Sequence, residues 1–538
     1  MPRSVAFLGV LLAMAPLVAL GACLDNGLNT EAGGAGGAGS TGPGGAGGAG
    51  GSGASAPEAR DPATCDEAAE MKTHMGCDFW PTVIANPVWS VFDFGVGVAN
   101  VTEEPAEVIV TRGDQEVLSA IIDPHSASTL YLPWVQTLKG EDWNEYTDLT
   151  LPTQSVRAPD GAYHLVSSRP VSVYQLNAVQ PSPEAGPEGK DWASCPSTFL
   201  DCLSYSNEAT LLLPSTSMTG SYRITSYSGS TEVLTSPYLA ITATEPETVV
   251  DIHLGSGAHI IAGEQITATN PGESTSLTLQ QGEVAEIFGT QTSDFSGSTV
   301  SASKPVQIIA GIPCSRIPFE ALGCNHLEEV VLPVETLGSH YLVPVPTGPI
   351  GLQTRHAVRL YGHVDNTELT YPGTIPPNAP VSLAAGQVVD LGLVEDNFEV
   401  SGNQPFGVST FLLAASTVNP NGGTGGPAHS NVVPLEQFRA RQSFFTPSGY
   451  DAIYLSIVTP RETTLSLDGV PINSEPERIS DDFNVVRVPI SPGQGSMHVV
   501  EASRDVSVQV IGYATRVAYH YPAAMNLARI NDPIPSGN

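Results

Sequence analysis

Short stretches in which apolar and polar residues alternate cover the chain from about residue 81 to residue 522. Clear examples are residues 171–174, 248–252 and 464–467. A period of two, bounded by Gly, Pro, Ser and Thr, predicts short β-strands with one buried face. Helical signals are confined to residues 66–71 and 435–442. The pattern therefore predicts an all-β fold.

One sequence pattern recurs four times, at residues 163–174, 298–309, 397–408 and 497–510. Each copy consists of an alternating segment, a Ser-x-x or Gly-x-x turn, and a second alternating segment. Pro170, Pro305 and Pro405 open the second segment in the first three copies, a position where a strand need not lose a ladder donor. We interpret each copy as a β-hairpin.

A second element follows each of the first three copies. It ends in Pro214, Pro333 or Pro434, and an aromatic residue (Tyr222, Tyr341 and Phe444) follows eight to ten positions later. Together the two elements divide residues 65–530 into four units, at about 81–180, 205–312, 325–418 and 429–522.

Units of about 100 residues favour tandem antiparallel β-sandwich-like modules. Residues 100–105 have the character of an arch between two sheets, which also favours a sandwich. A β-propeller is the alternative, because a continuous meander of short strands suits it as well.

The N-terminus predicts export. Residues 1–22 combine Arg3, an apolar run over residues 5–19 and small residues before Cys23, as in a secretory signal peptide. The run is shorter than the roughly 20 residues of a membrane-spanning helix. The sequence Leu20-Gly21-Ala22-Cys23 resembles the bacterial lipobox, in which the cysteine carries a diacylglycerol. An ordinary signal peptide with a chance cysteine is the alternative.

Residues 23–64 are interpreted as a lipidated N-terminus followed by a stalk rich in Gly and Ala. Such a composition buries too little apolar surface to offset the entropy of ordering, so flexibility is expected. The predicted location is the bacterial cell envelope, with the protein lipid-anchored in the outer membrane and exposed at the surface. The lipid at Cys23 is the expected membrane contact.

The charge balance excludes one class of partner. The 538 residues include 55 acidic and 21 basic side chains, a net charge of −34. Nucleic-acid binding needs a basic face that displaces counterions, so no nucleic-acid partner is expected.

Six cysteines other than Cys23 fall into three close pairs and predict three local disulfides: Cys65 with Cys77, Cys195 with Cys202, and Cys314 with Cys324. The last two pairs occupy matching places, between a repeat and its Pro-ended element. The third unit fills that place with a glycine-rich loop, residues 419–427. These loops are expected on one edge of the modules, either as a binding edge or as stapled surface loops without a ligand.

No catalytic motif is present: there is no Gly-x-Ser-x-Gly, phosphate loop or His-Glu-x-x-His. No catalytic residue, metal or cofactor is therefore predicted. His326, with Glu328 on the same face of a strand and Glu329 on the other, comes nearest to a ligand set. A hydrogen-bonded histidine beside the disulfide loop explains this pattern better than a metal, and Asn325, His326, Glu328 and Glu329 are kept as candidate binding residues.

Residues 305–344 contain a Pro-Val strand, a cysteine loop, Cys324-Asn325-His326, acidic residues, Leu332-Pro333, Gly338 and Tyr341-x-Val343. This order resembles the N-terminal domain family of IgG Fc-binding proteins, with similar stretches in surface lipoproteins of myxobacterial type. The resemblance covers most of residues 75–530 and implies an extracellular binding or adhesion role.

The sequence thus predicts a non-catalytic binding or adhesion scaffold for an extracellular protein or glycan. Two alternatives stay open. One is an envelope hydrolase with a site between modules, and the other is a structural subunit of the envelope.

Overall fold

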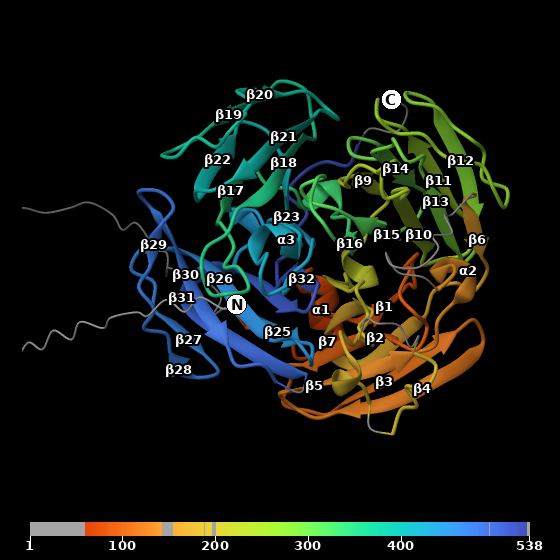
Figure 1. The fold of residues 1–538 in the computed structure, drawn as a ribbon, viewed down its shortest axis with the longest axis horizontal. Helices are drawn as coiled ribbons and strands as arrows, with labels where there is room; N and C mark the ends of the chain where they lie inside the picture. The colour runs from red at the N-terminus through yellow and green to blue at the C-terminus, as the bar shows by residue number, and fades with distance from the viewer. Residues whose placement is uncertain (1–59, 143–153, 188, 196–200, 494, 535–538) are drawn as a thin grey trace, which may run out of the picture. The chain divides into compact units, whose positions relative to one another are not determined.

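The computed structural model describes residues 60–142, 154–187, 189–195, 201–493 and 495–534. The predicted signal peptide, Cys23 and most of the predicted stalk lie outside these residues. The chain divides into two compact units, residues 1–57 and 58–538, and everything below concerns the second (Figure 1). Strands dominate it, so the all-β prediction is confirmed.

The helical elements in the described residues are short. They are α1 (Cys65–Met71), α2 (Gln136–Lys139), α3 (Ala415–Val418) and the single turns η1 (Pro183–Ala185), η2 (Ser215–Ser217), η3 (Val334–Thr336) and η4 (Leu435–Gln437).

Four modules with the same strand order make up the second unit. In module 1, the long strand β7 belongs to two sheets. Its first half lies in the order β4-β3-β7-β1 and its second half in the order β5-β2-β7-β8. The bounds are β1 (Gly76–Phe79), β2 (Phe94–Asn100), β3 (Ala106–Arg112), β4 (Gln115–Ile122), β5 (Ser126–Leu132), β7 (His164–Asn177) and β8 (Glu208–Leu211).

Module 2 repeats this order as β12-β11-β14-β9 and β13-β10-β15-β16, and β6 (Val156–Ala158) adds to β13. Its strands are β9 (Ser221–Arg223), β10 (Tyr238–Ala243), β11 (Thr248–His253), β12 (Ser274–Leu279), β13 (Val284–Phe288), β14 (Thr299–Ala302), β15 (Val306–Ser315) and β16 (Asn325–Val330).

Module 3 has the orders β20-β19-β22-β17 and β21-β18-β23-β24. Its strands are β17 (His340–Val343), β18 (His356–Gly362), β19 (Thr367–Thr370), β20 (Ser382–Leu383), β21 (Val388–Val394), β22 (Phe398–Gly402), β23 (Phe406–Phe411) and β24 (His429–Asn431).

Module 4 again uses one long strand, β31, in the orders β28-β27-β31-β25 and β30-β26-β31-β32, with β29 beside β30. Its strands are β25 (Arg439–Thr446), β26 (Ala452–Pro460), β27 (Leu465–Leu467), β28 (Val470–Pro471), β29 (Glu477–Arg478), β30 (Phe483–Ile490), β31 (Ser496–Ala514) and β32 (Val517–Pro522).

The hairpin interpretation of the fourfold repeat is wrong. The two halves of each copy do not pair with each other. β14 pairs with β9 and β11, whereas β15 pairs with β10 and β16. Each copy is one strand that leaves the first sheet and enters the second. We call the bend between the two sheets the corner. Pro305 and Pro405 interrupt the strand at the corner in modules 2 and 3, while β7 and β31 pass through it without a break.

This corner explains why the modules are sandwich-like. A propeller blade is a single four-stranded sheet, whereas here one bent strand joins two four-stranded sheets. The arch predicted over residues 100–105 is confirmed, because β2 and β3 pair with opposite halves of β7. The buried Asn100 closes this arch by donating to the carbonyl of Glu104 (2.8 Å).

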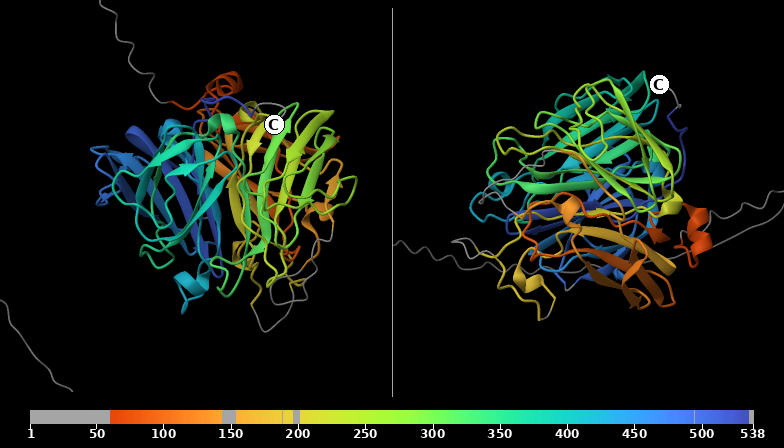
Figure 2. Two further views of the ribbon diagram at one scale, coloured as in Figure 1. Left: turned by 90° about the horizontal axis from the view of Figure 1, so that it is seen from above. Right: turned by 90° about the vertical axis from the view of Figure 1, so that its right-hand side faces the viewer.

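The final strands of the four modules meet. β8 contacts β16 and β32, and β24 contacts the same two strands, which closes a ring. The structure thus pairs β8, β16 and β24 with the module that precedes them, although the sequence units placed them at the start of the next one. Figure 2 places α1 and α3 at opposite ends of this body.

Candidate functional site

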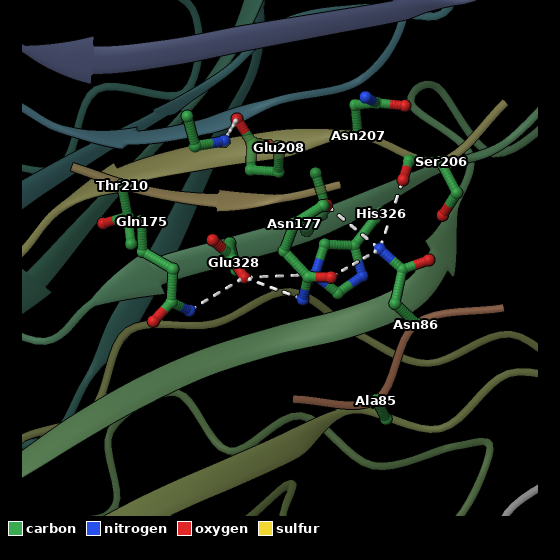
Figure 3. Close-up of polar contacts among 12 residues, drawn as sticks. Ala85, Asn86, Gln175, Asn177, Ser206, Asn207, Glu208, Thr210, His326 and Glu328 are labelled. Carbon is green, nitrogen blue, oxygen red and sulfur yellow. Dashed lines mark hydrogen bonds and ion pairs between the residues drawn. The ribbon is translucent and has the colours of Figure 1, made fainter. Parts of the chain in front are cut away.

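Polar side chains are buried where the four final strands meet (Figure 3). We call this set the central cluster. Its members are all at most 3% exposed: Asn177, Asn207, Glu208, Asn325, His326, Glu328, Glu329, His429, Asn431. They come from all the modules except the fourth, whose β32 contributes backbone groups.

Glu208 connects three modules. It lies at the start of β8, and its carboxyl oxygens accept the backbone N–H groups of His429 (3.0 Å) and His520 (3.3 Å). These two donors belong to β24 and β32. A side chain of module 1 therefore satisfies backbone donors of modules 3 and 4.

Asn325 has a similar role from β16. Its Oδ1 accepts the backbone N–H of Asn207 (2.9 Å). Its Nδ2 donates to the carbonyls of Asn207 and Pro427, both at 2.8 Å. The amide therefore ties module 2 to the segments that lead into β8 and β24.

Glu329 completes the connection. One carboxyl oxygen accepts the hydroxyl of Thr210 (2.8 Å), and the other accepts the backbone N–H (3.1 Å) and Nδ2 (3.0 Å) of Asn431. Glu328 points the other way, with its Oε2 3.4 Å from Nε2 of His326. The predicted division of Glu328 and Glu329 between the two faces of the strand is confirmed.

His326 and Glu328 form a neutral contact rather than an ion pair. Burial lowers the pKa of His326 to about 3 and raises the pKa of Glu328 well above its ordinary value. Asn177 also donates to Glu328 (3.2 Å). Within the described residues, Oε1 of Glu328 has no hydrogen-bond partner.

The carboxyls of the central cluster have no Lys or Arg ion-pair partner in the described part of the chain. Burial raises the pKa of Glu329 to about 8 and that of Glu208 well above its ordinary value. Glu329 is therefore mainly protonated at neutral pH, and burial shifts Glu208 in the same direction. The described residues contain no set of three His, Cys, Asp or Glu side chains placed to hold a metal ion.

The four candidate binding residues therefore lie in the interior, where a macromolecule cannot contact them. Sequence reasoning missed Glu208, Asn207 and Asn431, which complete the same cluster. A weak signal was present, because Glu208 and Asn431 lie within six residues before Pro214 and Pro434, as Glu329 lies four residues before Pro333.

The three predicted disulfides are present. Cys65–Cys77 joins α1 to β1, with Cα atoms 5.7 Å apart. Cys195–Cys202 and Cys314–Cys324 close loops with Cα separations of 6.1 and 5.2 Å. Each of these two loops runs from the corner strand to the final strand of its module, as the sequence pattern predicts.

The corresponding loops of all four modules meet. We call them together the loop face, which consists of the described parts of residues 195–205, residues 314–324 and 415–427, and Thr515–Arg516. Ser416 exchanges two hydrogen bonds with the backbone of Leu322 (2.9 and 3.0 Å). The N–H of Arg516 donates to the carbonyl of Gly423 (2.8 Å), and its guanidinium lies 6.0 Å from the ring centre of Tyr205.

The loop face presents a hollow and apolar side chains. A cavity of about 190 Å³ is lined by Leu322, Asn419 and Arg516 among others. Leu322 is 75% exposed and Phe319 is 42% exposed. α3 belongs to the loop face. Because Figure 2 shows α3 at the end of the body opposite α1, the loop face lies at that end.

No helix in the described ranges is long and apolar enough to cross a membrane.

Comparisons with known proteins agree with this geometry. The family model described as IgGFc binding protein matches residues 208–512, from the start of β8 to within β31. A human protein named IgGFc-binding protein is 25% identical over 259 residues. That match covers 46% of this chain but 4% of the human protein, and no solved structure matches. Since the family model spans more than half of its residues, this chain belongs to the IgGFc-binding protein family.

Proposed function

We propose that this protein is a non-catalytic binding or adhesion protein of the cell surface, anchored by a lipid on Cys23, that contacts an extracellular protein or glycan through its loop face. Membership of a family of binding proteins supports the binding role. The observation that carries the proposal is the convergence of four equivalent loops at one end of the body.

The chemistry of the loop face suits a macromolecular partner. Two disulfides and the Ser416–Leu322 contacts restrain the loops, so less conformational entropy is lost on binding than for free loops. Phe319 and Leu322 expose apolar surface beside the 190 Å³ cavity. Apolar and aromatic anchors beside a hollow are typical of the centre of a protein interface.

The acids that come together in the central cluster do not favour the hydrolase alternative. Glu208, Glu328 and Glu329 are at most 3% exposed and are hydrogen-bonded across modules. A general acid must reach its substrate within hydrogen-bond distance. These carboxyls therefore stabilise the contacts between the four modules.

A binding experiment tests the loop face. Cells that carry the full chain are compared with cells that carry Phe319→Ser and Leu322→Ser together, for attachment to immobilised matrix proteins, glycans and immunoglobulin Fc. Attachment to at least one surface is expected to fall about tenfold or more in the double variant. Val381→Ser is the matched control, because Val381 is 80% exposed but lies outside the loop face. Equal attachment of all three strains would refute the proposal.

A separate experiment tests the anchor. Cys23→Ala is expected to move the protein from the membrane fraction to the soluble fraction, because the acyl chains would be lost. Protease treatment of intact cells then reports whether the anchored protein faces outward. Retention of Cys23→Ala in the membrane fraction would contradict the lipid anchor and leave the loop-face proposal untouched.

A further inference from the structure

A second hollow lies between modules 2 and 3. This cleft has a volume of about 1390 Å³. Its walls come from the β9 end, the β11–β12 connection, the loops around His363 and Gly386, and the C-terminal segment 529–534. It shares no lining residue with the loop-face cavity.

The cleft contains an unusual arginine. Four cationic side chains in the described residues are buried: Lys139, Arg223, Arg359 and Arg439. Lys139 pairs with Asp142 at 2.7 Å, Arg359 with Asp294 at 2.7 Å, and Arg439 with Asp61 at 2.8 Å. Within the described ranges, Arg223 has no such ion pair. A buried charge without a counterion is costly.

The contacts of Arg223 leave most of its hydrogen-bonding capacity unused. Its Nη1 donates to the carbonyl of Gly297 (2.9 Å) and its Nη2 to the carbonyl of His363 (3.1 Å). Its Nε has no partner among the described residues. Two of the five guanidinium N–H groups are thus used. Burial lowers the pKa of Arg223, and the nearby Tyr361 and Asp365 offset part of that effect.

Glycines bring the two modules together around this guanidinium. A Cβ on Gly297 would lie 2.3 Å from the carbonyl oxygen of Gly386. A Cβ on Gly386 would lie 3.0 Å from Nη1 of Arg223. Both glycines have positive φ, at 85° and 75°. The close approach holds the charge at the boundary between the modules while keeping space open above it.

We propose that this cleft binds an acidic saccharide whose carboxylate pairs with Arg223. The charged side chains of Arg529, Asp365 and Asp532 also line the cleft, as do the neutral polar side chains of Gln387, Gln404 and Asn531. Such groups suit the hydroxyls of a sugar. The net charge of −34 disfavours the approach of a polyanion, so a single carboxylate is a better match than a sulfated chain.

The test measures binding of a glucuronic-acid-ended trisaccharide to the full chain by calorimetry. The same trisaccharide ending in glucose and a short acidic peptide are the comparison ligands. Binding of the acidic sugar is expected to exceed that of either comparison ligand by about 10- to 100-fold, the range of a charge-assisted hydrogen bond. Arg223→Met is expected to remove this advantage. Arg504→Met is the matched control, because Arg504 is exposed and outside the cleft.

A second variant tests the cleft independently, in case Arg223→Met does not fold. Ser256→Trp places a large side chain at an exposed position of the cleft and leaves Arg223 intact. It is expected to weaken binding of the acidic sugar at least tenfold without changing the melting temperature. Equal binding of the acidic and neutral sugars, equal or tighter binding of the peptide, or unchanged binding in Ser256→Trp would each overturn the proposal. None of these results bears on the loop face.

Discussion

Glu329 offers a direct test of the conclusion that the central cluster holds neutral acids. Burial raises its pKa from 4.5 to about 8 in the folded protein. Because the folded state then binds the proton more tightly than the unfolded state, the stabilising effect is complete below pH 4.5. It is lost as the pH rises towards 8. A shift of this size corresponds to about 5 kcal/mol of unfolding free energy between those limits, at about 1.4 kcal/mol per pH unit.

The substitution Glu329→Gln replaces the protonated acid by a neutral group of the same shape. It keeps an acceptor for Asn431 but changes the hydrogen bond with Thr210, which costs about 1 kcal/mol. The variant is therefore expected to be less stable than the wild type near pH 5, by less than about 1 kcal/mol. Near pH 9 it is expected to be about 3–4 kcal/mol more stable, because it has no proton to lose.

Urea unfolding of both proteins at pH 5, 7 and 9, followed by tryptophan fluorescence, measures this difference. The buried histidines titrate equally in both proteins and cancel in the comparison. Glu368→Gln makes the same chemical change at an exposed position and is expected to show no pH-dependent difference. If Glu329→Gln were destabilising by the same amount at pH 5 and pH 9, Glu329 would not be a buried neutral acid and the reasoning would fail.

Four further predictions concern single features of the fold. Tyr222→Phe is expected to cost about 1–3 kcal/mol in urea unfolding, because its hydroxyl joins the N–H of Thr219 to the carbonyl of Val306 at the sheet-switching corner. Arg359→Met is expected to cost about 3–5 kcal/mol, since it leaves Asp294 without its partner at 2.7 Å, and added salt should not restore the loss. Replacing both cysteines of Cys314–Cys324 by serine is expected to lower stability by about 3 kcal/mol. Dithiothreitol is then expected to destabilise the wild type more than the variant, because the variant has only the other two disulfides to lose. Glu208→Leu is expected to be more destabilising than Glu208→Gln in thermal melts, because leucine leaves both backbone donors of β24 and β32 unsatisfied whereas glutamine keeps an acceptor for one of them.

The sequence predicts the outer sheets well because their strands bury one face. In β11, residues alternate strictly between buried and exposed, as period-two reasoning expects. The inner strands behave differently. Every residue of β10 and β16 is buried, since other modules cover the second face. Glu328 and Glu329 therefore look like surface residues in the sequence although they lie in the interior.

Strand pairing was harder to predict than strand position. The segment before Pro305 and the segment after it both have strand character, and proline is compatible with a hairpin as well as with a corner. What distinguishes the two is the partner strand, and β14 finds β11 about 50 residues earlier in the chain. Local patterns contain no information on that choice. A corner signal was nevertheless present in Tyr222 and Tyr341, whose hydroxyls donate to the carbonyls of Val306 and Phe406 (both 2.6 Å).

The central cluster stabilises one arrangement of the four modules over other arrangements. Its amide and carboxyl groups reach partners far away in the chain, such as Pro427 for Asn325 (102 residues) and His520 for Glu208 (312 residues). A purely apolar interface would tolerate sliding or exchange of similar modules, since hydrophobic attraction is non-directional. Here a misplaced module would leave a buried amide or carboxyl unpaired, at a cost of about 1–3 kcal/mol for each group. Because burial raises the pKa of the three acids and so favours their neutral forms, this selectivity avoids the larger desolvation cost of buried charges. The one buried cation that lacks an ion pair within the described residues, Arg223, lies outside the cluster at an open cleft. This contrast separates polar groups that hold the modules together from a charge that is available to a ligand.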